Sequence, residues 1–147
     1  MNLTKRNLLS SALLGLALTA LFPVFAPGED NSAVKKDVGL LQGEWMMLSG
    51  SADGQIMPEP LRKQMKRVCE GDLVTVTMGG QIYVKAKFTI DPSKSPKIID
   101  YEMTDGFTKG KRQLGIYEVE GDTLRACYAP PGKETPTEFA WKEGSGS

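Results

Sequence analysis

Two β-like segments joined by a Gly-Asp pair constrain the fold of this chain more than any other stretch. Leu114–Glu120 and Thr123–Ala129 flank Gly121-Asp122, and the rigid corner Pro130-Pro131-Gly132 follows them. A glycine-containing pair between two such segments is typical of a hairpin, and proline ends a strand because it cannot donate to a ladder. The stretch therefore predicts an antiparallel β domain, without indicating what the domain does.

The same kind of pattern recurs along the chain. Ile82–Ile90 alternates strictly between apolar and polar residues, which indicates a strand with one buried and one wet face. Other β-like segments begin at Gly43 and cover Val68–Met78 (with a break at Gly71-Asp72), Ile98–Met103 and Thr137–Lys142. Pro58–Arg67 has the apolar spacing of one short helix. Short connections between about seven to eight strands predict an antiparallel up-and-down barrel or a strongly curved sheet.

The first 28 residues have the organisation of an export signal. Met1–Arg6 is short and basic, Asn7–Ala26 is apolar, and small residues follow. We therefore predict a signal peptide over residues 1–28, a flexible lead-in over residues 29–37 and a β domain over residues 38–147. The predicted location is periplasmic, cell-surface or secreted. The alternative is an uncleaved signal anchor, since the apolar run approaches the length that spans a bilayer.

The amino-acid composition excludes several classes of function and points to none. The 147 residues are enough for one domain, and 18 basic residues balance 18 acidic ones, so no basic surface for nucleic acid is expected. The chain has no histidine, which excludes Ser-His-Asp triads, Cys-His dyads and His-ligated metals. Asp100 and Glu102 share a strand face, where solvated carboxylates are the simpler interpretation than a glycosidase pair. We expect no catalytic residues, no metal and no cofactor.

The segment Leu41-Gln42-Gly43-Glu44-Trp45 introduces a family resemblance. A Gly-x-Trp entry to the first strand of an antiparallel meander resembles the lipocalin signature. In lipocalins the tryptophan closes one end of the barrel, often against an arginine from a late strand. That resemblance implies a contact between Trp45 and Arg125.

The chain also resembles, more closely, a lipocalin-like domain of unknown function found in exported planctomycete proteins. The residues that carry this resemblance are Leu41–Trp45, Asp91–Lys94, Leu114–Tyr117, Gly121–Arg125, Cys127–Gly132 and Pro136–Phe139. It implies the fold and assigns no catalytic residue. Members of the family continue past the Gly-Ser-Gly at Gly144–Gly146 with one more apolar strand, whereas this sequence ends at Ser147. We therefore expect a sheet that does not close at its C-terminal edge.

The hypothesis for function is a non-enzymatic binding domain for a small apolar molecule or lipid. The candidate ligand-binding residues are Trp45, Phe88, Tyr101, Tyr117, Arg125 and Tyr128. Aromatic residues at alternating strand positions can line a ligand cavity, and they fit ordinary core packing equally well. The alternative function is an envelope module that binds protein or glycan through its outer face or open sheet edge. The oligomeric state is left open.

Cys69 and Cys127 are the two cysteines of the chain. In an oxidising compartment they could form a disulfide, and the alternative is a pair of free thiols. A catalytic thiol is not expected, because no histidine is present to activate it.

Overall fold

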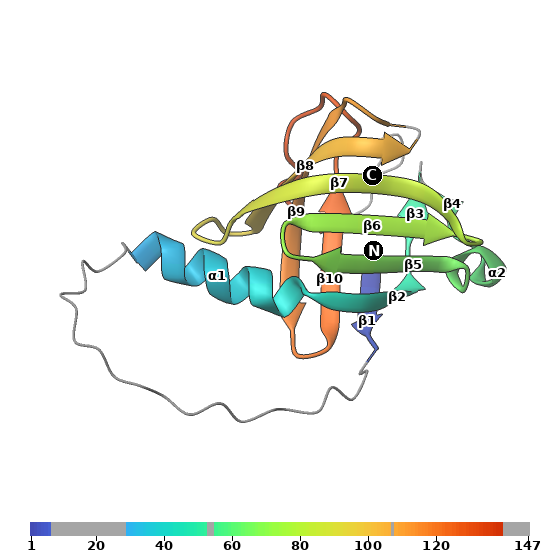
Figure 1. Ribbon diagram of the computed structural model, residues 1–147, viewed down its shortest axis with the longest axis horizontal. Helices are drawn as coiled ribbons and strands as arrows, with labels where there is room; N and C mark the ends of the chain where they lie inside the picture. The colour runs from blue at the N-terminus through green and yellow to red at the C-terminus, as the bar shows by residue number, and fades with distance from the viewer. Residues whose placement is uncertain (7–28, 53–54, 107, 140–147) are drawn as a thin grey trace.

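The chain folds into a closed antiparallel barrel of eight strands (Figure 1). The computed structural model describes residues 1–6, 29–52, 55–106 and 108–139. The order of strands around the barrel is β1-β10-β9-β8-β7-β6-β5-β2. Their bounds are β1 Asn2–Lys5, β2 Gly43–Ser49, β5 Met65–Glu70, β6 Leu73–Met78, β7 Gln81–Asp91, β8 Lys97–Gly106, β9 Arg112–Glu120 and β10 Thr123–Tyr128. The antiparallel barrel predicted from the alternating segments is confirmed.

The barrel closes through β1, so the expectation of an open C-terminal edge is wrong for the described strands. Leu3 of β1 pairs with Leu124 of β10 on one side and with Met47 of β2 on the other. Its side chain is only 2% exposed. The closing strand thus comes from the basic start of the predicted signal peptide, a segment that sequence reasoning had set apart from the fold.

The predicted last strand, Thr137–Lys142, is not observed as such. Thr137–Phe139 form bends, and residues 140–142 lie outside the described part of the chain. The pair Asp53-Gly54, whose sequence is typical of a tight hairpin turn, also lies outside it. The strands on either side of that turn, β3 (Ser51–Ala52) and β4 (Gln55–Ile56), pair as a small antiparallel sheet of their own.

Residues 29–37, predicted to be a flexible lead-in, form most of helix α1 (Glu29–Leu41). The polar sequence of α1 gives no apolar pattern from which a helix could be predicted. The helix is held instead by contacts with residues far along the chain. Asp37 is buried on α1 and binds Lys97 of β8 and Tyr117 of β9. Gln42, just after the helix, accepts a hydrogen bond from the Gly71 backbone and donates one to its carbonyl oxygen, which fixes α1 to the turn after β5.

The predicted helix over Pro58–Arg67 is too long. Helix α2 covers only Glu59–Arg62, and Met65–Arg67 belong to strand β5. Alternation in β5 is regular, with Met65, Arg67 and Cys69 facing inward. This correction moves Arg67 from a helix surface to the barrel interior.

The two helices mark opposite ends of the barrel (Figure 1). Helix α1 lies at one end, while α2, β3 and β4 lie at the other. Between them, the hydrophobic core includes Leu3, Leu41, Trp45, Val74, Ala86, Phe88, Ile99, Met103 and Leu124. In the described residues, no helix combines the length and the apolar character that a membrane span requires.

Candidate functional site

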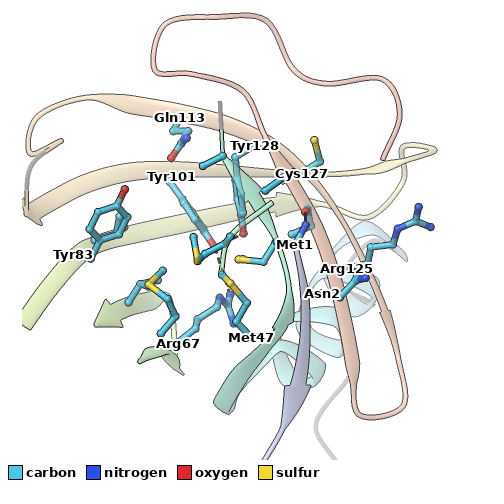
Figure 2. A pocket seen from close by; sticks show the side chains of 18 of the residues that line it. Met1, Asn2, Met47, Arg67, Tyr83, Tyr101, Gln113, Arg125, Cys127 and Tyr128 are labelled. Carbon is cyan, nitrogen blue, oxygen red and sulfur yellow. Dashed lines mark hydrogen bonds between the residues drawn. The ribbon is translucent and has the colours of Figure 1, made fainter. Parts of the chain in front are cut away.

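A cavity of about 440 Å³ occupies the part of the barrel that faces β3 and β4. Figure 2 shows side chains of its lining, which come from all eight strands of the barrel. The apolar part of the lining consists mainly of Met47, Met57, Met65, Val76 and Val84. Methionine side chains adapt to irregular shapes, so this wall suits a flexible apolar group. A volume of this size falls within the range of small-molecule sites.

Tyr83 stands at the rim of the cavity because of a β-bulge. On β6, Val76 pairs with Val84 and Thr77 pairs with Ile82, which leaves Tyr83 as the extra residue on β7. A bulge redirects side chains relative to simple alternation. Tyr83 is therefore 43% exposed while it also lines the cavity, so the cavity reaches the protein surface here.

Arg67 is the charged group at the floor of the cavity. It pairs in register with Trp45 of β2, and its side chain faces inward with only 2% exposure. Its Nη2 donates to the Tyr101 hydroxyl at 3.5 Å, the upper limit for a hydrogen bond. Its Nε and Nη1 atoms are buried and have no hydrogen-bond partner among the described residues. A buried guanidinium with unsatisfied donors is costly, and such a group in a native structure requires an explanation.

Two tyrosines complete the polar floor. The hydroxyls of Tyr101 and Tyr128 are 2.8 Å apart and share one hydrogen bond, and their rings stack with centroids 5.1 Å apart. Gly115 makes this arrangement possible, since a Cβ atom there would lie 2.6 Å from Cδ1 of Tyr128. Figure 2 shows Arg67, Tyr101 and Tyr128 pointing toward one another inside the barrel.

The electrostatics of this floor are positive and rich in donors. Among the described residues, none of those that line the cavity is acidic. Burial lowers the pKa of Arg67, but Tyr101, Tyr128 and Cys69 together raise it more, so the guanidinium stays protonated. Burial, followed by the neighbouring Tyr101 hydroxyl, raises the pKa of Tyr128 well above its ordinary value, so this hydroxyl stays neutral. Because one hydrogen bond between two hydroxyls uses one of their two hydrogens, the other remains available to an acceptor.

The end of the barrel next to α1 is packed and internally satisfied. Trp45 is fully buried, and its Nε1 donates to the Leu41 carbonyl oxygen at 2.9 Å. The Asp37 carboxylate accepts hydrogen bonds from Lys97 at 2.6 Å and from the Tyr117 hydroxyl at 2.8 Å. Burial and the bond to Asp37 raise the pKa of Tyr117. These groups form a structural network, with each buried charge paired.

The candidate residues predicted from sequence divide between the two regions. Tyr101 and Tyr128 line the cavity. Trp45 and Tyr117 belong to the packed end, and Phe88 is buried beside Tyr101 with ring centroids 6.4 Å apart. These last three residues are packed in the core, and the first two border the cavity.

Arg125 borders the cavity. The lipocalin resemblance implies a contact between Arg125 and Trp45, and the structure instead places the Arg125 side chain against Phe139. Its guanidinium lies 4.6 Å from the centre of the Phe139 ring and 3.9 Å from the Glu118 carboxylate. Figure 2 shows its side chain directed away from the cavity. Lys5 of β1 instead lies over the Trp45 ring, with Nζ 5.7 Å from the ring centroid.

The two cysteines do not form a disulfide, and Asp100 belongs to an ion pair. Cys69 and Cys127 are both free thiols, and burial raises the pKa of Cys69, which keeps that thiol protonated. Asp100 is paired, accepting a hydrogen bond from Arg112 at 2.9 Å. Over the described ranges, no group of three or more His, Cys, Asp or Glu side chains gathers in a way that could hold a metal ion.

Sequence reasoning missed Arg67, the residue that most distinguishes the cavity. The available signal was the alternation of Met65, Arg67 and Cys69 with Lys66, Val68 and Glu70, which places an arginine in the inward phase of a strand. Comparison with known proteins adds no further guide, because no family model, no curated protein and no solved structure matches this chain.

Proposed function

We propose that this protein binds a small, largely apolar molecule or lipid inside its barrel. The observation that carries the proposal is the cavity of about 440 Å³ lined by methionine and valine side chains. A scaffold domain would fill this space, since protein interiors are normally close-packed. The cavity also reaches the surface at Tyr83, which gives a ligand a path of entry. We further propose, from the N-terminal sequence, that the protein acts outside the cytoplasm as a lipocalin-like binding domain and keeps its N-terminal segment uncleaved, because strand β1 is part of the barrel.

The alternative, an envelope module that docks protein or glycan, has less support. Exposed apolar residues do occur on the outside, among them Leu48, Ile56, Ile82 and Leu73. They come from different strands, and single exposed apolar residues are normal on protein surfaces. The described strands of the barrel form a closed ring, so they offer no free edge for strand addition.

A cavity-filling substitution tests the proposal. Met57→Trp places a bulky ring inside the cavity, and Leu48→Trp adds the same ring at a side chain that is 50% exposed and outside the lining. Binding of 1-decanol, followed by calorimetry and native mass spectrometry, should be lost in the first variant and kept in the second. Equal binding by both variants, or no binding by the unmodified protein, would overturn the proposal.

A further inference from the structure

The floor of the cavity is chemically unlike its walls. The walls are apolar, whereas the floor carries the Arg67 guanidinium with an exposure of 2%. One N–H on Nε and two on Nη1 have no acceptor among the described residues. A charge in this position destabilises the protein on its own, because its lost hydration is not replaced by a partner. The side chain therefore points to a binding partner that supplies acceptors and a negative charge.

We propose that the floor is a subsite for a monocarboxylate, so that the ligand is an amphipathic acid with its carboxylate on Arg67 and its apolar tail among the methionines. This inference rests on the proposed function, because it assigns the head group of the molecule that the cavity holds. A planar guanidinium offers parallel N–H donors that match the two oxygens of a carboxylate.

The tyrosine pair fits the same head group. One hydroxyl hydrogen of the Tyr101–Tyr128 pair is free to donate, and the pair lies beside the guanidinium. Carboxylate oxygens accept several hydrogen bonds at once, from charged and neutral donors together. Gly115 keeps the Tyr128 ring in place, since its missing side chain is the space that the ring occupies.

Charge balance favours one negative charge on the ligand. Arg125 also borders the cavity, but it lies over Phe139 and near Glu118, so it is directed elsewhere. The Met1 amino group donates to the Ala126 carbonyl oxygen at 2.8 Å, and burial lowers its pKa. Among the described residues, Arg67 is thus the cation at the floor of the cavity, and a single carboxylate neutralises it.

The position of Arg67 also gives the ligand an orientation. Arg67 is paired with Trp45, which belongs to the packed end, while Tyr83 lies at the rim. The carboxylate would be deep in the barrel and the end of the tail would lie near Tyr83 and Met57. Ligands that carry a bulky group at the tail end are therefore better tolerated than ligands with a bulky head.

The test compares decanoate, 1-decanol and decyltrimethylammonium as probes of one chain length and three head groups. A charge-assisted hydrogen bond to a buried donor gives a preference on the order of 10- to 100-fold, which we expect for decanoate over 1-decanol. Arg67→Met should remove that preference, because decanoate loses its charged partner. Arg112→Met, at an exposed arginine outside the lining, is the matched control and should keep the preference within about 2-fold.

The outcomes separate the two proposals. If decanoate and 1-decanol bind equally, or if Arg67→Met keeps the preference, the carboxylate subsite is overturned while the cavity remains a binding site. If no probe binds, the proposed function fails and the subsite fails with it. Should Arg67→Met not fold, Tyr128→Phe provides the second variant, with an expected loss of about 5- to 10-fold in decanoate binding alone. An unchanged preference in Tyr128→Phe would then count against the subsite.

Discussion

Asp37 and Arg67 are both buried charged side chains, but only Asp37 has a full set of hydrogen-bond partners among the described residues. Asp37 is 5% exposed and accepts hydrogen bonds from Lys97 and Tyr117, so the fold itself neutralises it. Arg67 is 2% exposed and keeps unsatisfied donors beside a cavity. The fold compensates a buried charge that has complete partners, whereas a buried charge without them is destabilising, which supports the ligand subsite that we propose. The packed end and the cavity floor of this barrel illustrate the two cases.

The largest expected effect comes from removing β1, which contributes to both regions. Met1 and Asn2 line the cavity, Leu3 is buried, and Lys5 lies over Trp45. A chain that begins at Glu29 loses the Leu3 packing and leaves β2 and β10 with unpaired edges. We expect its free energy of unfolding to fall by at least about 5 kcal/mol, or its fold to be lost. Urea unfolding of the two chains measures this, and equal midpoints would contradict the role of β1.

Next in size is a comparison along β2, where Trp45 belongs to the packed end and Met47 to the cavity wall. Trp45→Ala should lower the free energy of unfolding by about 4 kcal/mol, because a fully buried ring leaves a new hole. Met47→Ala should cost about 1 kcal/mol, since its side chain already borders empty space. Chemical denaturation of both variants tests the difference, which would disappear if the two ends were equally packed.

Breaking the Asp37 network should have an intermediate effect. Asp37→Ala removes the acceptor of Tyr117 and the partner of Lys97, which is 39% exposed and can turn to solvent. We expect a loss of about 2 kcal/mol in the free energy of unfolding. Lys97→Ala, the control on the exposed partner, should cost less than Asp37→Ala. The reverse order would show that the buried carboxylate is not the centre of this network.

Arg67→Met should act in the opposite direction. Replacing an unpaired buried cation by an apolar side chain of similar length should raise the free energy of unfolding by about 1–2 kcal/mol when no ligand is added. Thermal unfolding in ligand-free buffer measures it, with Arg125→Met as the exposed control. A loss of stability as large as that of Asp37→Ala would mean that Arg67 is a structural group.

The smallest expected effect is the response to alkaline pH, to which each region contributes one tyrosine. Burial raises the pKa of Tyr117 and of Tyr128 above the ordinary 10.0. Above pH 10.0 the unfolded chain loses these protons and the folded protein keeps them, so stability is complete below that pH and declines above it. The slope is at most about 1.4 kcal/mol per pH unit for each tyrosine. Replacing both tyrosines by phenylalanine should flatten the plot of unfolding free energy against pH above pH 10.0. An unchanged slope would mean that other groups cause the loss of stability.

The strands of the barrel could be predicted where alternation and turn residues agree. The hairpin of β9 and β10 and the long strand β7 follow directly from their sequences, since each needs only local pattern and one glycine turn. Helix α1 could not be predicted, because its polar sequence is held by Asp37 contacts with residues 60 and 80 positions away. Strand β1 was missed for a related reason. Its composition is that of a signal peptide, and only the gap between β2 and β10 gives it a place.

The site was predicted in part. Aromatic residues at alternating positions are expected to face a barrel interior, and Tyr101 and Tyr128 do line the cavity. Trp45, Phe88 and Tyr117 satisfy the same pattern and are packed, since pattern gives the face of a side chain and not the space around it. The helix predicted over Pro58–Arg67 includes Arg67, whereas the structure places it in β5. Hydrophobic periodicity marks apolar residues as inward-facing, so it does not indicate a charged residue in that position.

The carboxylate subsite is tested most directly by the titration of a bound acid. Decanoate labelled with ¹³C at its carboxyl carbon reports its own ionisation by NMR while it is bound to the full chain. Contact with the Arg67 guanidinium should hold the pKa of the bound carboxyl below the ordinary value of about 4, by roughly one unit or more. A carboxyl buried without that contact would instead show a raised pKa, because burial disfavours the charged form. A bound decanoate whose pKa is raised, or equals that of the free acid, would contradict the assignment of Arg67 as the carboxylate partner.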